Sequence, residues 1–281
     1  MPDDVEPERR RNDIGVVSPK SLHGSRRPDT HLAAFSSVGI RPGIPPSSAL
    51  LGRHDTKIAR VIGGGLAAVV IAVMTGMTST LLVRPLLRRL PEPIPGGGTP
   101  SYRELGSTRF LFACGALAGI AAAVSWLSLP RYAQPMWCVL AILGVLLAAI
   151  DARTSWLPLQ LTRFSWLAMA GAALLAAPLG GGFWVPVRAA AGAAIAGGLY
   201  LLVWLISRGG FGFGDVRFAP LLGAAAAADS WALMWWTLLL GTVVGGLAGV
   251  LRLARGRREA FPYAPSMLLG AYAACMVAKL S

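Results

Sequence analysis

The feature that most constrains this chain is a series of long apolar runs without a charged side chain. The first, residues 61–83, is long enough for a helix to cross the ~30 Å hydrocarbon core of a bilayer. Backbone groups must find their hydrogen bonds inside the protein at that depth, so runs of this length favour transmembrane helices. With 54% hydrophobic and only 14% charged residues, the chain has the composition of a membrane protein.

Further apolar runs follow the first along the rest of the sequence. Each is bounded by arginine, aspartate, proline or glycine, which mark turns and membrane surfaces. The pattern predicts an all-α polytopic membrane protein with about eight transmembrane helices. The seven later runs are residues 110–129, 136–150, 164–179, 189–206, 218–228, 231–251 and 263–277.

Residues 1–60 differ in composition from the remainder. They are rich in arginine, proline and serine, show neither helical nor strand periodicity, and do not resemble a secretory signal peptide. We expect a disordered extension here, or a translation start placed too far upstream. The predicted domain organisation is therefore an N-terminal extension, 1–60, and a transmembrane domain, 61–281.

The distribution of charge predicts how the spans are oriented. Residues 61–281 hold sixteen Lys/Arg but only six Asp/Glu, and the turns after the third and fifth spans carry aspartates, Asp151 and Asp215. If both aspartates share one face, thirteen of the bases lie on that face and three on the other. Because basic loops stay in the cytoplasm, the aspartate face is predicted to be cytoplasmic, in the inner (cytoplasmic) membrane. The net charge of +13 thus reports topology and does not indicate nucleic-acid binding.

The side chains absent from the predicted transmembrane domain exclude several chemistries. All three histidines lie within residues 1–60, so Ser-His and Cys-His nucleophile pairs and His-containing metal sites are disfavoured. The only lysine after residue 60, Lys279, falls on the opposite face from the aspartates. The cysteines Cys114, Cys138 and Cys275 stand singly in apolar runs and form no metal-binding pair. We therefore predict no cofactor and no metal.

What remains is the chemistry of the two carboxylates. Asp151 ends the third span and Asp215 begins the sixth, so both are expected at one membrane face. Two carboxylates at close range do not both ionise easily, and the pair can share one proton. One can then deprotonate a water molecule while the other protonates a carbonyl oxygen and later the leaving amine. This pattern favours hydrolysis without a metal.

Simpler interpretations stand beside this hypothesis. An aspartate before a helix, such as Asp215, is often an N-cap. Asp229 is interpreted as a turn or cap residue, and Glu92, Glu104 and Glu259 as solvated loop residues. Asp151 fits a cap less well, because a negative charge at a helix C-terminus opposes the helix dipole.

Three stretches around the two aspartates form an ordered set of motifs. They are Ala149-Ile150-Asp151 with Trp156 to Thr162, Gly212-Phe213-Gly214-Asp215-Val216-Arg217, and Phe261-Pro262-Tyr263-Ala264-Pro265 with Leu268 to Ala271. These stretches resemble the motifs of the type IV prepilin peptidases, the membrane aspartic peptidases with a Gly-x-Gly-Asp motif. The resemblance covers roughly residues 61–280, and Arg88-Arg89-Leu90-Pro91 after the first span is also similar in kind.

The resemblance implies an endopeptidase that removes the short basic leader from type IV pilin-like precursors at the cytoplasmic membrane face. Asp151 and Asp215 then carry over as the catalytic pair, and Gly212 and Gly214 as the motif backbone. Arg217 stands where the family usually has lysine. Many members also N-methylate the cleaved product and carry a Cys-x-x-Cys insert after the first span; residues 84–109 contain no cysteine, so the chain resembles the short, peptidase-only form.

Two other functions remain open. A presenilin-type protease shares Gly-x-Gly-Asp but has a Tyr-Asp motif and a Pro-Ala-Leu motif, whereas Ile150 precedes Asp151 here. A proton-coupled transporter could use Asp151 and Asp215 as a relay, although relays favour carboxylates near the bilayer midplane. The expected partners are pilin-like precursors and the lipid bilayer; the oligomeric state is not predicted.

Overall fold

The computed structural model of this protein describes residues 47–90, 104–208, 212–256 and 261–280. The chain divides into two compact units, Met1–Ser47 and Ser48–Ser281, and the helices described here form the second. Within these ranges all regular structure is helical, which confirms the predicted all-α class. Residues 1–46, where we expect disorder, lie outside the described part of the chain.

The helices follow one another with short connections. Two of the inserted segments, η3 and η4, are π-helical. Two further short segments are 3₁₀ turns. In chain order the main elements are α1 (Ser47–Arg89), α2 (Thr108–Ser128), α3 (Gln134–Val139), η3 (Leu140–Gly144), α4 (Val145–Thr154), α5 (Leu159–Ala176), η4 (Ala177–Gly181), α6 (Trp184–Ile206), α7 (Phe213–Asp229), α8 (Trp231–Ala254) and α9 (Ala264–Leu280).

Several of these helices can span a bilayer, which confirms the multi-pass prediction. The predicted sixth and eighth spans correspond to α7 and α9. Each has 17 residues and is shorter than the helical stretches that correspond to the other predicted spans. Among the described residues six stretches are long and apolar enough to cross a membrane: Gly63–Arg89, Thr108–Ser128, Arg131–Thr154, Leu159–Gly181, Trp184–Ile206 and Trp231–Ala254.

α1 and the third span each extend beyond the apolar runs that predict them. α1 begins at Ser47, so its first turns fall within the segment 1–60 that we assign to an extension. The third span runs on past Ile150 to Thr154, so Asp151 lies inside the helix and not after it. Both extensions have one cause: a helix does not stop where hydrocarbon stops, because its backbone hydrogen bonds continue through polar residues. The domain boundary after residue 60 stays a prediction.

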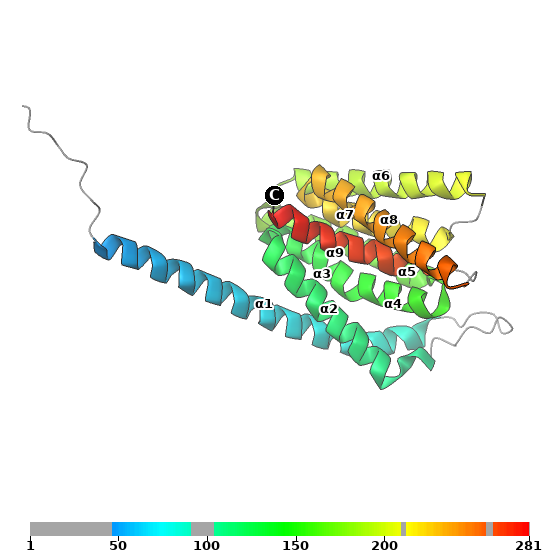
Figure 1. The fold of residues 1–281 in the computed structure, drawn as a ribbon, viewed down its shortest axis with the longest axis horizontal. Coiled ribbons are helices and arrows are strands. Elements are labelled where there is room, and N and C mark those ends of the chain that lie inside the picture. The colour runs from blue at the N-terminus through cyan, green and yellow to red at the C-terminus, as the bar shows by residue number, and fades with distance from the viewer. Residues whose placement is uncertain (1–46, 91–103, 209–211, 257–260, 281) are drawn as a thin grey trace, which may run out of the picture. The chain divides into compact units, whose positions relative to one another are not determined.

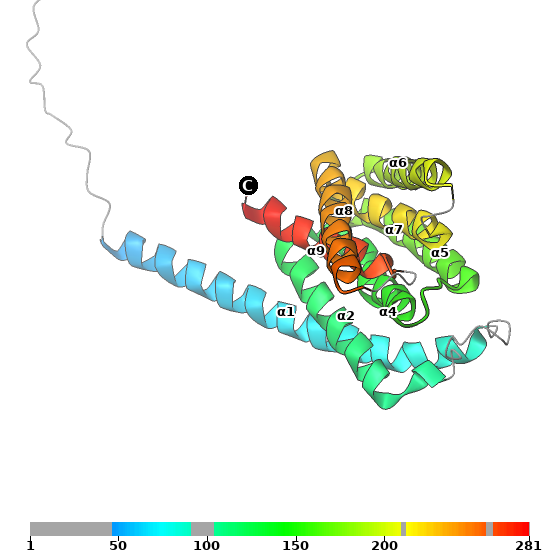
Figure 2. The ribbon, with the colours of Figure 1, turned by 45° about the vertical axis from the view of Figure 1, so that its right-hand side comes forward.

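α7 is the most enclosed helix of the bundle. Twelve of its 17 residues are buried, including the alanines from Ala224 to Ala228. Figures 1 and 2 show α7 running among α5, α6, α8 and α9. Its closest neighbour is α6, where Gly192 faces Gly223 so tightly that a side chain on either would overlap the other's carbonyl oxygen. Small residues therefore set the position of α7.

The third span is interrupted by the π-helical segment η3, which separates α3 from α4. A π-segment places one extra residue in a helix and changes which side chains face inward beyond it. Leu140 and Ala141 of η3 and Ile150 of α4 are all fully buried. The next residue of the same helix, Asp151, is also buried in the protein interior.

Candidate active site

Asp151 lies in the last turn of α4 and is only 4% exposed. Its Oδ2 accepts a hydrogen bond of 3.1 Å from the backbone N–H of Ala264, the first residue of α9. The N-terminus of a helix carries partial positive charge, so α9 stabilises a negative charge on Asp151. This contact answers the objection that an acid at the end of α4 opposes the dipole of its own helix.

Asp215 lies in the first turn of α7 and is 6% exposed. It is not the N-cap, which is Gly212, and its side chain makes no capping bond. Its own N–H donates to the carbonyl of Gly212 at 3.1 Å. The Asp151 carboxylate is close enough for its charge to act on Asp215. The structure therefore brings the two sequence-predicted aspartates together, at the end of the bundle where α4 ends and α7 and α9 begin (the right-hand end in Figure 1).

The two glycines of the Gly-x-Gly-Asp motif leave space for two different side chains. A Cβ on Gly212 would lie 2.9 Å from Oδ2 of Asp215, and a Cβ on Gly214 would lie 2.9 Å from Cδ1 of Leu157. Gly212 has φ −67° and ψ 126°, which any residue can adopt. Glycine is needed at these two positions because a Cβ would collide with the neighbouring side chain. At Gly212 the backbone conformation itself does not require glycine.

Leu157 belongs to the turn that joins α4 to α5. Ser155 adopts the left-handed conformation, with φ 54°. The hydroxyl of Thr154 donates to the carbonyls of Ile150 and Trp156 and accepts from the N–H of Trp156. These bonds fix the turn and direct Leu157 inward, where it is buried beneath Gly214. The first predicted motif thus packs directly against the second.

Aromatic side chains hold the start of α7 from the other side. The indole N–H of Trp166, on α5, donates to the carbonyl of Arg217 at 3.0 Å. The Arg217 guanidinium lies over the Phe213 ring, 4.6 Å from its centroid, and Phe213 in turn meets Trp204 of α6 edge-on at 5.1 Å. These contacts anchor the turn that carries Asp215 to both α5 and α6. Sequence reasoning missed Trp166, since a tryptophan in an apolar run gives no signal of its partner.

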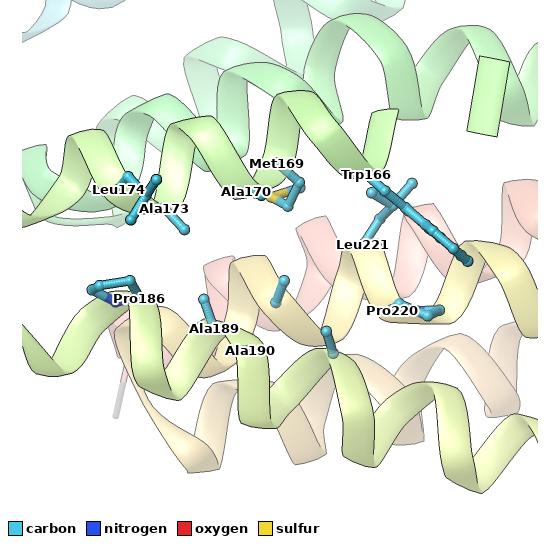
Figure 3. Close-up of a pocket in the computed structure, with 12 residues that line it drawn as sticks. Trp166, Met169, Ala170, Ala173, Leu174, Pro186, Ala189, Ala190, Pro220 and Leu221 are labelled. Atoms are coloured by element: carbon cyan, nitrogen blue, oxygen red, sulfur yellow. The ribbon is translucent and has the colours of Figure 1, made fainter. Parts of the chain in front are cut away.

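An apolar cavity of about 540 Å³ opens between α5, α6 and α7. Figure 3 shows Trp166 and Pro220 toward one end and Leu174 and Pro186 toward the other. Because Trp166 also bonds Arg217, this cavity starts close to the turn that carries Asp215. Its wall consists of Trp166, Met169, Ala170, Ala173, Leu174, Pro186, Ala189, Ala190, Ala193, Pro220, Leu221 and Ala224.

Asp229 lies at the opposite end of α7 from Asp215. It accepts a hydrogen bond of 3.2 Å from the hydroxyl of Tyr132, and Arg188 donates to the neighbouring Ala228 carbonyl at 2.6 Å. This agrees with its interpretation as a helix-end residue. Glu92, Glu259 and the side chain of Glu104, which we expect to be solvated, lie outside the described part of the structure.

The helices and the enclosed carboxylates define a class: a multi-pass α-helical membrane protein with an acidic site at the helix ends. Residues 138–250 match the model of the type IV leader peptidase family. This match confirms the resemblance that the sequence motifs indicate. The match indicates a peptidase with protein substrates in a membrane environment.

The matched segment contains both aspartates and Gly-x-Gly-Asp, and it ends within α8. Ala264, whose N–H reaches Asp151, therefore lies beyond it. No curated protein and no solved structure matches the chain.

Proposed function

We propose that this protein is an aspartic endopeptidase that removes the short basic leader from type IV pilin-like precursors at the cytoplasmic face of the inner membrane. The observation that carries the proposal is the pair of buried carboxylates, Asp151 and Asp215, close enough for their charges to interact. Each lies at a helix N-terminus: Asp151 at that of α9, Asp215 in the first turn of α7. Gly212 and Gly214 provide the space that this placement requires.

The two carboxylates have different surroundings, which supports different roles. Asp151 accepts the Ala264 N–H at the start of α9 and is the better site for the negative charge. That charge disfavours a second one on Asp215, so the shared proton resides on Asp215. In the proposed reaction Asp151 takes a proton from water, and the water oxygen attacks the scissile carbonyl carbon. Asp215 gives its proton to the carbonyl oxygen. The C–N bond then breaks as Asp151 passes the proton it took from water to the leaving amine, and Asp215 regains a proton from a hydroxyl of the tetrahedral intermediate.

The position of the pair favours a peptidase over a proton-coupled transporter. Both aspartates lie at helix ends, where the site of an enzyme that acts on peptides at a membrane surface is expected, whereas a relay is expected near the bilayer midplane. The short, cysteine-free segment 84–109 further supports a peptidase without N-methyltransferase activity.

The test is co-expression of the protein with a pilin-like precursor from the same genome, with leader removal scored by mass. We expect wild type to cleave, and Asp151→Asn and Asp215→Asn to insert normally and to lose more than about 10³-fold in rate. Asp229→Asn is the matched control, because Asp229 occupies the other end of α7, and it should cleave like wild type. Full cleavage by either site variant would refute the paired-carboxylate mechanism.

A further inference from the structure

Two tyrosines pair beside the aspartates, one from α6 and one from the segment before α9. The rings of Tyr200 and Tyr263 lie 6.4 Å apart between centroids, inclined at 52°. Tyr200 is 5% exposed, and Tyr263 is half-buried. Sequence reasoning assigned a role to neither.

Tyr263 sets the start of α9. Its carbonyl accepts hydrogen bonds from the N–H groups of Ser266 at 3.0 Å and Met267 at 3.2 Å. Tyr263 thus provides the acceptor for the first turn of this helix. The very next N–H, that of Ala264, is the donor to Asp151. Any movement of Tyr263 therefore moves the donor that Asp151 depends on.

The ring of Tyr263 is held on three sides. Phe261 meets it edge-on, with centroids 6.2 Å apart, and Tyr200 packs against it from α6. On the third side α8 presents Gly245, whose missing side chain leaves the space that the ring occupies. A ring held in this way has little freedom to turn, so it is a rigid support for the first turn of α9.

Tyr200 brings a second helix into this support. The ring of Tyr263 is held by α6 through Tyr200 and by α8 through the space at Gly245. Because Asp151 accepts the first N–H of α9, both helices influence the position of that donor.

We propose that Tyr263 and Tyr200 are positioning residues for Asp151: the two packed rings hold the start of α9, and with it the Ala264 donor, against this carboxylate. This inference rests on the proposed peptidase function for its meaning in catalysis. Both tyrosines act through their rings and not through their hydroxyl groups.

The first experiment measures kcat and KM for leader cleavage by Tyr263→Leu, Tyr200→Leu, Tyr263→Phe and Tyr200→Phe. We expect the two leucine variants to lower kcat about tenfold or more with KM nearly unchanged, and the two phenylalanine variants, which keep the rings, to stay within about threefold of wild type. The matched control is Tyr272→Leu, at a buried tyrosine of α9 whose ring packs on Trp137 and not on Tyr263. Wild-type kcat in both leucine variants of Tyr263 and Tyr200 would overturn the proposal.

A second readout does not require peptidase activity. A carbodiimide with a small amine labels exposed or protonated carboxyls, and peptide mass spectrometry reports the rate at each aspartate. We expect Tyr263→Leu and Tyr200→Leu to change the labelling of Asp151 by about threefold or more, with Tyr272→Leu like wild type. If wild type does not cleave but this pattern holds, the proposed function fails and the positioning role stands. If wild type cleaves and neither tyrosine variant changes the labelling, the positioning role is wrong.

Discussion

The backbone N–H of Ala264 donates to Oδ2 of Asp151 at 3.1 Å, across 113 residues of sequence. The bond joins the end of α4 to the start of α9, and it makes α9 part of the site although this helix lies beyond the segment that matches the peptidase family. A hydrogen bond to a buried carboxylate costs more when it is lost than an ordinary one, so a single backbone atom should have a measurable effect on cleavage.

Ala264→Pro removes that N–H and puts the ring Cδ in its place, facing Oδ2 of Asp151. Proline is well accepted at the first position of a helix, so α9 should still form. Losing a hydrogen bond to a charged group costs about 1.5–3 kcal/mol and the ring adds a steric contact, so we expect kcat/KM for leader cleavage to fall about tenfold or more. Ala264→Gly keeps the N–H and should cleave like wild type. Equal activity in the proline and glycine variants would show that Asp151 does not need this donor.

Gly212→Ala tests the space beside Asp215. The backbone of residue 212 permits alanine, but its Cβ would lie 2.9 Å from Oδ2 of Asp215, so the carboxylate must turn away. We expect kcat to fall about tenfold or more, while the amount of inserted protein stays unchanged. Gly198→Ala on α6, where a Cβ meets no atom within 4 Å, is the control. If Gly212→Ala is as active as Gly198→Ala, this glycine has no steric role.

Gly245→Ala tests the support of Tyr263 from α8. Its Cβ would overlap the Tyr263 ring, whereas a Cβ on the next residue, Gly246, meets open space. Alanine is a better helix former than glycine by about 1 kcal/mol, so Gly246→Ala should raise or preserve thermal stability in detergent. Gly245→Ala should lower stability and cleavage together. The neighbouring variants share a helix and differ only in what they face, so similar melting temperatures would contradict the packing described.

Trp166→Phe tests the anchor between α5 and α7. The change keeps an aromatic ring but removes the indole N–H that donates to Arg217. We expect a loss of about 1 kcal/mol in unfolding free energy, seen as a lower melting temperature. Trp156→Phe is the matched control, because Trp156 is 70% exposed in the α4–α5 turn. Equal melting of the two variants would show that the bond to Arg217 contributes nothing to stability.

The sequence predicts those parts of this molecule that depend on local pattern. Uncharged runs reveal the helices because hydrocarbon excludes charge, and turn residues place Asp151 and Asp215 at one end of the bundle. The sequence does not show the partners, since Ala264, Leu157 and Trp166 meet their contacts through tertiary packing that no spacing rule encodes. The sequence also predicts that the third span ends at Ile150, because a charged residue usually marks the end of an apolar helix. In the structure the N–H of Ala264 in α9 binds Asp151, so the helix continues past it. The catalytic roles of the two aspartates stay a prediction.

The burial of α7 has a consequence for how the protein is made. The alanines from Ala224 to Ala228 all face protein, so α7 has little apolar surface to expose to lipid. By itself it therefore gains little free energy by moving from the translocon into the bilayer. α6 is long and apolar, and its Gly192 meets Gly223 of α7 directly. The two helices are therefore best released into the bilayer as a preformed hairpin, and the acidic site is completed only when α9, which follows both of them in the chain, docks its first turn on Asp151.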